Sequence, residues 1–481
     1  MCGIVGYCGP RPATEILLAG LKRLEYRGYD SAGICVSDGN DITTVKRKGK
    51  IRDLREIVPA DLSGASGIGH TRWATHGEVN DANAHPHTNC SGDMAVVHNG
   101  IVENYIVLKE KLEAEGHVFK SDTDSEVLAH LISSFYTGDL EQAVKQVVPL
   151  VKGTYGILCV HADEPGRIVG ARNGSPLVLG IGNGEMFLAS DVTAMMAYTR
   201  QVVYLEDGDV VVVDSESYQT TDAKDQNIEK KIESIDWELQ EIEKGGFPTF
   251  MEKEIFEQPQ SIERGMQGRL DRVLATAHLG GLNLSSKELL NVERVKIVAT
   301  GTSYHAAMVA SYLFESLARI PCTAELASEV RYKNPVVEKN ALHFVISQSG
   351  ETADTLYAMR ELQRKGATVP GICNVVGSTI PRESDGGVYI HSGPEIAVAS
   401  TKAFTSQLVA LYEFTLLMAR MRHLSFEEGS IILQNLESLP GLVAQVLSSS
   451  EGIQKLAAKY CQATDFLFLG RGLNYPVALE G

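Results

Sequence analysis

Residues 295–303 read Val-Lys-Ile-Val-Ala-Thr-Gly-Thr-Ser, and this segment indicates the fold of the C-terminal half. A short β-branched run is typical of a buried strand, and the glycine after it predicts a tight loop before a helix over 304–317. The same order recurs in a strand over 342–346, a loop, and a helix over 352–364, and again from a strand over 388–390 to a helix ending near residue 420. This repetition predicts a parallel sheet covered by helices on both faces, with ligands at the carboxyl ends of the strands.

A fourth instance of the pattern lies near the C-terminus. Asp-Phe-Leu-Phe-Leu at 465–469 precedes Gly-Arg-Gly at 470–472, which resembles the segment at 295–303. We therefore expect a strand at 465–469 that opens a second copy of the same domain.

The N-terminal half shows a different pattern of expected strands and helices. Residues 1–220 read as short strands and loops with a few amphipathic helices, among them a helix over 15–24 and a buried strand over 210–213. A strongly charged segment then runs into a glycine–proline stop at 245–248. We expect a first domain at 2–221, a charged linker at 222–250, a second domain at 251–430, and the incomplete start of a third at 431–481.

Composition narrows the class of protein. The net charge of −17 argues against a nucleic-acid-binding or anionic-membrane surface, and no apolar run approaches the ~20 residues of a membrane helix. The eight cysteines are scattered without a Cys-x-x-Cys pair, so their spacing indicates neither a zinc site nor a disulfide framework. No secretory segment precedes Cys2. We expect a cytoplasmic protein without a metal, a cofactor, a nucleic acid or a membrane as partner.

Cys2 is the strongest candidate for a catalytic residue. Removal of Met1 would leave a thiol and a free α-amino group on one residue, and that amine titrates near pH 8, at about 7.7–8.0. It could therefore accept the thiol proton at neutral pH, a known way to activate a nucleophile. The alternative is an ordinary buried cysteine near the start of a strand.

Three further positions could complete an acyl-transfer site. Asn99-Gly100 offers an amide side chain and an approachable backbone N–H for an oxyanion hole, Arg72 offers a fork for a carboxylate, and Asp124 could hold an amino group. Each has a structural alternative. Asn-Gly is typical of a type I′ hairpin turn, and Thr123 with Glu126 fits a capping box for a helix over 125–134.

His85-Pro86-His87 could suggest a metal site. No cysteine or carboxylate pattern accompanies the two histidines, so the structural interpretation is preferred.

A phosphate site is predicted in the C-terminal half. Ser347, Gln348, Ser349 and Thr352 supply polar groups within six residues, and Thr302 with Ser303 follow the neighbouring strand of the repeat. Hydroxyls and loop amides at helix N-termini suit a phosphate group. The alternative is capping of the next helix by these hydroxyls.

Taken together, these motifs resemble those of one family. The segments that carry the resemblance in the N-terminal half are 2–6, 26–33, 70–77, 98–100 and 123–124, and those in the C-terminal half are 301–303, 347–352 and 399–402. They are similar to the glutaminase domain and the sugar isomerase (SIS) domain of the glutamine–fructose-6-phosphate aminotransferases. The resemblance implies an α/β multidomain chain: an N-terminal-nucleophile amidotransferase domain, an αββα sandwich, followed by doubly wound parallel-sheet SIS domains.

The resemblance also implies roles for named residues. Cys2 would attack the glutamine amide while Asn99 and Gly100 stabilise the oxyanion. The rest of glutamine would be held by Arg72, Thr75, His76 and Asp124, and Trp73 would gate the passage of ammonia. Fructose 6-phosphate would be bound by Thr302, Ser303, Ser347, Gln348, Ser349, Thr352, Val398, Ala399 and Ser400.

The family reaction turns L-glutamine and fructose 6-phosphate into glutamate and glucosamine 6-phosphate, in a homodimer that needs no cofactor. Two alternatives stay open: an amidotransferase acting on another sugar phosphate, and a sugar-phosphate-binding regulatory protein with an inert glutaminase half. By the same resemblance, groups used in the sugar chemistry lie beyond Gly481. We therefore expect this chain to lack synthase activity, to pack poorly over its last ~40 residues, and to belong to a longer gene product.

Overall fold

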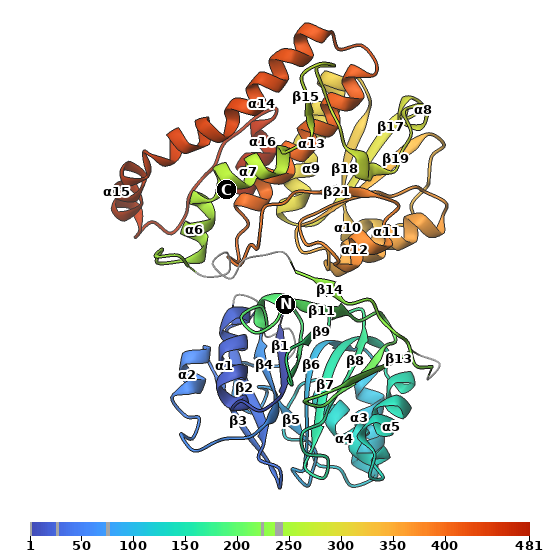
Figure 1. The fold of residues 1–481 in the computed structure, drawn as a ribbon, viewed down its shortest axis with the longest axis vertical. Helices are drawn as coiled ribbons and strands as arrows, with labels where there is room; N and C mark the ends of the chain where they lie inside the picture. Colours follow the sequence, from blue (N-terminus) through green and yellow to red (C-terminus); the bar gives the residue numbers. More distant parts are fainter. Residues whose placement is uncertain (1, 26–27, 74–76, 223–225, 236–243) are drawn as a thin grey trace. The chain divides into compact units, whose positions relative to one another are not determined.

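The computed structural model describes residues 2–25, 28–73, 77–222, 226–235 and 244–481. The chain divides into two compact units, residues 1–239 and 240–481, each with its own core (Figure 1). The division falls inside the segment 222–250 that the sequence predicts as a linker. That segment is not linker throughout, because the short strand β14 (Glu233–Ser234) pairs with β11 (Gln201–Tyr204) and extends a sheet of the first unit.

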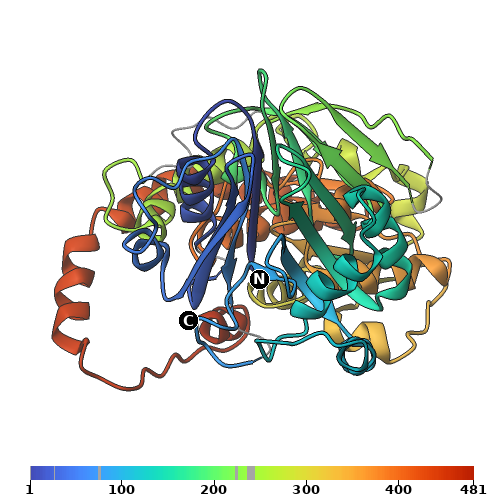
Figure 2. The same ribbon diagram turned by 90° about the horizontal axis from the view of Figure 1, so that it is seen from below.

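The first unit is built on two antiparallel sheets (Figure 2). In spatial order, the first sheet contains β14, β11, β9 (Val178–Ile181), β10 (Met186–Ala189), β1 (Gly3–Cys8), β4 (Ser66–Arg72), β2 (Ser31–Ser37) and β3 (Ile42–Lys48). The second contains β13 (Tyr218–Thr221), β12 (Val210–Val213), β8 (Ile168–Asn173), β7 (Gly153–His161), β6 (Met94–Val102) and β5 (His87–Thr88). Helices α1 (Ala13–Leu24) and α2 (Ile51–Arg55) pack on the first sheet, and α3 (Tyr105–Ala114), α4 (Glu126–Phe135) and α5 (Leu140–Val147) belong to the side of the second.

Strand β6 shows how the sequence builds these layers. Its alternate residues Ala95 and Val97 enter the core between the two sheets, whereas Met94 and Val96 enter the core shared with α4 and α5. Both faces are buried, which explains why the strand reads as a continuous apolar run. The order helix, sheet, sheet, helix is the αββα sandwich that the family resemblance implies.

The second unit is a five-stranded parallel sheet. Its strands, in spatial order, are β18 (Cys322–Leu326), β17 (Arg294–Ala299), β19 (Ala341–Ser347), β20 (Gly371–Cys373) and β21 (Gly387–Tyr389). Helices α9 (Thr302–Leu313) and α13 (Lys402–Arg420) share one core with the sheet, and α10 (Ala327–Tyr332), α11 (Ala353–Arg364) and α12 (Thr379–Glu383) share another. The remaining elements are α6 (Phe250–Phe256), α7 (Gln258–Met266), the hairpin β15 (Leu270–Asp271) and β16 (Thr276–Ala277), α8 (Ser286–Leu290), α14 (Phe426–Leu447), α15 (Ser450–Tyr460) and α16 (Asn474–Glu480).

The strand order locates a ligand site. Along β17, Ile297 faces the core of α9 and α13, while Val298 faces the core of α11, so helices cover both faces of the sheet. The chain runs from β17 outward to β18 and then back across β17 to β19. In open sheets of this order, ligands bind outside the carboxyl ends of the strands where the direction reverses. That switch point lies between β17 and β19, which is where the sequence predicts the phosphate loops.

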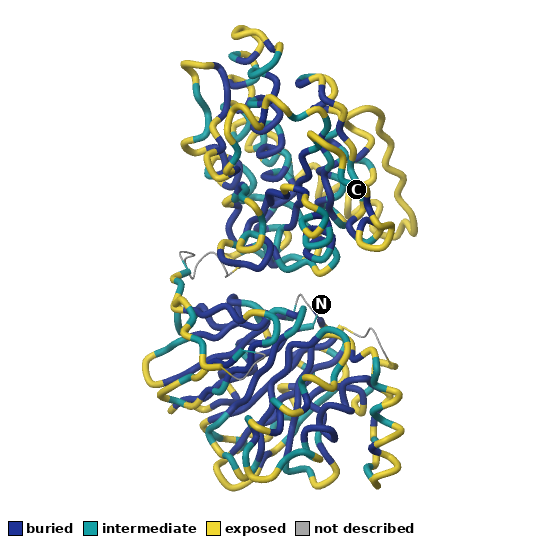
Figure 3. Tube along the Cα trace, turned by 90° about the vertical axis from the view of Figure 1, so that its right-hand side faces the viewer, coloured by how far each residue is buried: buried dark blue, intermediate teal, exposed yellow. Residues whose placement is uncertain are grey.

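The C-terminal segment departs from the expected start of another domain at residue 431. Residue 431 lies inside α14, and this helix packs into the second unit through Leu433 and Leu436. Residues 465–469 do not form the expected strand. Residues 451–475 are exposed and run along the outside of the unit (Figure 3), whereas α16 packs against α9.

One further property concerns membranes. Within the described ranges, no helix combines the length and the apolar character required to cross a lipid bilayer.

Candidate active site

Cys2 lies directly before β1, next to the residue that follows β4. These strands pair antiparallel, with Gly3 opposite Thr71, so Cys2 comes level with the end of β4. The backbone N–H of Trp73 donates to Cys2 Sγ over 3.3 Å, and the thiol lies 3.5 Å from the Trp73 carbonyl oxygen. Burial raises the pKa of the Cys2 thiol, whereas the Trp73 N–H and the Arg72 guanidinium lower it by stabilising the thiolate. The thiol therefore needs a base before it can attack.

Asn99 and Gly100 lie within β6, so the interpretation of this pair as a hairpin turn is wrong. Asn99 Nδ2 donates to the backbone carbonyl of Cys2 over 3.0 Å, which joins the second sheet to the first at Cys2. Gly100 has φ +133°, and a Cβ at this position would lie 2.0 Å from the carbonyl oxygen of Thr154. Only glycine allows this close approach.

His70, which the sequence analysis did not single out, fixes the orientation of Asn99. Its Nε2 lies 3.0 Å from Asn99 Oδ1 and 3.1 Å from the carbonyl oxygen of His98. Both partners are acceptors, so Nε2 carries the proton and donates to them. Burial lowers the pKa of His70 to about 3, which keeps the ring neutral. With Oδ1 held by His70, the Asn99 amide presents its NH₂ group to Cys2.

Asp124 does not act as a helix cap. Its Oδ2 accepts the backbone N–H of Val102 in β6 over 2.7 Å, and the Ser125 hydroxyl lies 2.7 Å from His98 Nδ1. Helix α4 begins after Ser125, and no side chain caps it. The capping-box interpretation is therefore wrong, and Asp124 is held beside the strand that carries Asn99 and Gly100.

A small cavity of about 30 Å³ connects these groups. Its lining includes Cys2, Arg72, Trp73, Gly100 and Asp124, five of the residues predicted from the sequence. The other lining residues are His85, His98, Thr123 and Ser125. The predicted residues Thr75 and His76 lie outside the described residues.

Arg72 and Trp73 differ in their surroundings. Arg72 is buried, and its guanidinium donates to the carbonyl oxygen of Glu78 over 3.3 Å. Trp73 is 38% exposed and meets the ring of Tyr29 edge-on at 5.1 Å. The Arg72 guanidinium thus lines the wall of the cavity, and the Trp73 ring lies at the exposed side of the cavity.

His85 and His87 have structural surroundings. Both are buried, and His85 stacks on His70 with ring centroids 4.1 Å apart. His87 Nε2 lies 3.0 Å from Thr123 Oγ1. Burial holds the pKa of each ring well below its usual value, so both are neutral packing residues.

The predicted phosphate loop follows β19. The Ser347 hydroxyl lies 2.9 Å from that of Thr352 and accepts the N–H of Gly350 over 3.0 Å. Ser349 Oγ accepts the N–H of Glu351 over 3.2 Å. Helix α11 begins directly after Thr352, and no side chain caps it. Capping therefore does not account for these hydroxyls, which lie beside the N-terminus of a 12-residue helix where an anion is favoured.

The other predicted sugar-phosphate residues have protein partners. Thr302 donates to the carboxylate of Glu480 over 2.6 Å, and the same carboxylate lies 2.6 Å from His305 Nδ1. Because the Glu480 carboxylate already contacts Thr302, it would repel a phosphate there. The loop 347–352 is therefore the better phosphate site.

Ser303 and Ser400 also have partners. Ser303 Oγ accepts from Gln407 over 3.1 Å, and Ser400 donates to Glu395 over 2.9 Å. Gln348 and Ala399 lie in the loops after β19 and before α13, and Val398 is largely exposed. Glu480, His305 and Gln407 could not be assigned from sequence, because their roles depend on contacts between distant segments. Glu395 bonds residues within eight positions of itself, but no motif marked it.

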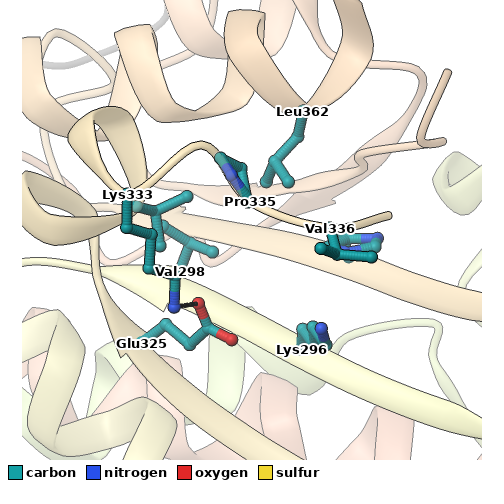
Figure 4. A pocket seen from close by; sticks show the side chains of 9 residues that line it. Lys296, Val298, Glu325, Lys333, Pro335, Val336 and Leu362 are labelled. Atoms are coloured by element: carbon teal, nitrogen blue, oxygen red, sulfur yellow. Dashed lines mark hydrogen bonds and ion pairs between the residues drawn. The ribbon is translucent and has the colours of Figure 1, made fainter. Parts of the chain in front are cut away.

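A cavity of about 100 Å³ lies in the second unit. Figure 4 shows Lys296, Val298 and Leu362 in its lining, with Lys333 and Glu325 forming an ion pair at 2.6 Å. None of the predicted sugar-phosphate residues lines this cavity.

Fold and site together define the class of this protein. A cysteine at the start of an αββα sandwich, joined to a doubly wound sugar isomerase domain, defines a glutamine amidotransferase. Family models agree: a glutamine amidotransferase domain matches residues 70–197, and an SIS domain matches residues 288–417.

Curated relatives identify the family. A glutamine–fructose-6-phosphate aminotransferase (isomerizing) of Chlorobaculum tepidum is 50% identical over all of this chain and 80% of its own length. One from Thermus thermophilus is 50% identical over all of this chain and 79% of its own length. A solved C-terminal domain of the Francisella tularensis enzyme is 39% identical over 50% of this chain and 67% of its own, with a TM-score of 0.47. The chain belongs to the family of isomerizing glutamine–fructose-6-phosphate aminotransferases.

Proposed function

We propose that the first unit hydrolyses the side-chain amide of L-glutamine and that the second unit binds fructose 6-phosphate, which accepts the released ammonia in the family reaction. The products are L-glutamate and D-glucosamine 6-phosphate. The observation that supports this proposal is the hydrogen bond from Asn99 Nδ2 to the backbone carbonyl of Cys2, which joins Asn99 and the adjoining Gly100 in β6 to the residue that carries the thiol. The names of the relatives support the choice of substrates.

The chemistry begins once removal of Met1 exposes the α-amino group of Cys2. The amine takes the thiol proton, and the thiolate attacks the amide carbon of glutamine. Of the two N–H groups on Asn99, one donates to the Cys2 carbonyl, and the other is available for the oxyanion together with the Gly100 N–H. The protonated amine then gives its proton to the departing nitrogen, and ammonia leaves. Water attacks the thioester that remains and releases glutamate.

The other glutamine groups are assigned by charge. Arg72 pairs with the α-carboxylate, and Asp124 pairs with the α-ammonium group. Thr75 and His76 complete this part of the site by family resemblance, and Trp73 gates the passage of ammonia.

In the second unit, the phosphate is held by the loop 347–352, with Thr302, Ser303 and the segment 398–400 around the sugar. In the family reaction, ammonia adds to the C2 carbonyl of fructose 6-phosphate, and loss of water gives an imine. A proton shift from C1 to C2 then yields the 2-amino aldose. The family resemblance also supports a homodimer, which light scattering of the purified chain would test.

Substitution of the nucleophile tests the proposal directly. Cys2→Ala should abolish glutamate release and leave the thermal melting curve unchanged, since the thiol carries the chemistry and little packing. Cys461→Ser serves as a control, because Cys461 is exposed in the second unit. Substantial glutamine hydrolysis by Cys2→Ala would refute the assignment. A panel of hexose phosphates, assayed by calorimetry, distinguishes fructose 6-phosphate from other sugars. The glutamate-release assay distinguishes an amidotransferase from a regulatory binding protein with an inert glutaminase half.

A further inference from the structure

Three potential metal ligands from separate segments meet beside the middle of α4. Cys90 lies in the turn between β5 and β6, His117 follows α3, and His130 lies within α4. His130 Nδ1 is 3.2 Å from His117 Nδ1 and 3.7 Å from Cys90 Sγ. All three ligand atoms lie within 4.8 Å of one another.

These separations suit a tetrahedral ion. Zinc bonds of ~2.0–2.1 Å to nitrogen and ~2.3 Å to sulfur place two nitrogens about 3.3 Å apart and a nitrogen and a sulfur about 3.6 Å apart. The two observed contacts to His130 are close to both values. Without a proton or a cation between them, the lone pairs of two Nδ1 atoms at 3.2 Å would repel each other.

The surroundings of His130 favour the tautomer that binds a metal. Its ring is 1% exposed, and Nε2 has no hydrogen-bond partner within 3.5 Å among the described residues. Nε2 lies 3.6 Å from the carboxylate of Glu126, one helical turn earlier. That carboxylate is held by the N–H groups of Lys120 and Ser121 over 2.8 and 2.7 Å. A fixed carboxylate facing Nε2 places the proton there and leaves the Nδ1 lone pair toward Cys90 and His117.

The cysteine supplies an accessible sulfur ligand. Cys90 is exposed, and its sulfur accepts the N–H of Val118 over 3.3 Å, a contact that stabilises a thiolate. Two imidazoles and one thiolate leave a fourth position of a tetrahedral ion for water.

We propose that Cys90, His117 and His130 form a binding site for a zinc-class divalent ion in the amidotransferase unit, with Glu126 as the carboxylate that orients His130. The site ties the β5–β6 turn and the end of α3 to α4. Because Asp124 and Ser125 lie directly before α4, the ion would hold the start of that helix beside the glutamine cavity. This site could not be recognised from sequence, because the spacing of residues 90, 117 and 130 matches no common zinc motif.

The test uses the metal-free full chain with Zn²⁺ and Co²⁺ as probes. All variants carry Cys2→Ala, so that the thiol at position 2 does not bind the ions itself. We expect one tightly bound Zn²⁺ per chain in competition with a chromophoric chelator, and a thiolate-to-cobalt charge-transfer band with Co²⁺. Cys90→Ser should abolish the band. Zn²⁺ should also raise the melting temperature, and Cys90→Ser should remove that rise.

Graded substitutions separate ligands from neighbours. Glu126→Gln should weaken Zn²⁺ binding by about 10–100-fold, as expected for the partner of a ligating histidine, and His117→Gln should weaken it more. Cys461→Ser, which changes an exposed cysteine outside the cluster, should leave binding unchanged. Since His130 is buried and its substitution could unfold the unit, the accessible positions 90 and 117 decide the question. Absence of stoichiometric binding, or equal affinity in Cys90→Ser and its parent, would overturn the proposal.

Discussion

Replacing Gly100 with alanine should damage both the stability and the glutaminase activity of the first unit. The new Cβ would lie 2.0 Å from the Thr154 carbonyl oxygen, whereas real Cβ contacts are essentially never shorter than 3.0 Å. Strand β6 would have to move away from β7 by about 1 Å. Position 100 also has φ +133°, which an alanine adopts only under strain.

The magnitude follows from these two effects. Backbone strain of roughly 1–3 kcal/mol and a steric cost of about the same size give a loss of about 2–6 kcal/mol in the free energy of unfolding. A shift of about 1 Å at a catalytic group lowers the rate about 100-fold. Since Gly100 contributes an oxyanion N–H in the proposed mechanism, kcat for glutamate release should fall at least that far.

The assay compares Gly100→Ala with Gly166→Ala. Gly166 also has a positive φ, +77°, but nothing lies within 4 Å of its hypothetical Cβ. It therefore reports backbone strain without the clash, and it lies in the turn between β7 and β8. Melting temperature and steady-state glutamate release are measured for both variants. A Gly100→Ala protein with the kcat and melting temperature of the parent would refute the close approach of Gly100 in β6 to Thr154 in β7.

Three further predictions rest on single residues. Asn99→Ala should lower kcat for glutamine hydrolysis by about 10²–10³-fold with little change in KM, measured by glutamate release, because one oxyanion donor is lost; an unchanged kcat would contradict this. Ser349→Ala should raise the calorimetric Kd for fructose 6-phosphate by roughly tenfold or more, since a hydrogen bond to a charged group contributes about 1.5–3 kcal/mol; an unchanged Kd would place the phosphate elsewhere. Glu413 is fully buried beside Arg269, and burial raises the pKa of its carboxyl from 4.5 to about 7. The folded state thus keeps a proton that the unfolded state releases, so stability should fall by up to about 3 kcal/mol as pH rises from 4.5 to 7 and stay level above. Melting temperatures of Glu413→Gln should show a smaller decline over this range, and parallel pH curves for the two proteins would exclude the role of Glu413.

The sequence predicts the second unit well because its signals are local. The pattern for each strand, loop and helix of the repeat is contained in a short stretch of consecutive residues. Parallel pairing of β17 and β19 then brings the loops after these two strands together. The strand expected at 465–469 fails for the same reason, since an apolar window predicts a strand only where a neighbouring strand is available to pair with it.

In the first unit, local patterns were less informative. Asn99-Gly100 has the composition of a hairpin turn, yet it continues β6, because β7 pairs along its whole length. The Thr123–Glu126 pattern suggests a cap, yet Asp124 bonds Val102 and Glu126 bonds the segment before the helix. His70 could not have been assigned from sequence, because its role depends on a contact with Asn99 across the two sheets.

The contact between Asn99 and Cys2 has a consequence for folding. The thiol belongs to one sheet and the amide donor to the other, so neither sheet alone contains a working site. During refolding from denaturant, recovery of glutamine hydrolysis should therefore lag behind the return of far-ultraviolet circular dichroism and coincide with closure of the inter-sheet core. The rate at which glutamine hydrolysis recovers should thus report the rate at which the two sheets dock. A partly folded chain should show no glutaminase activity.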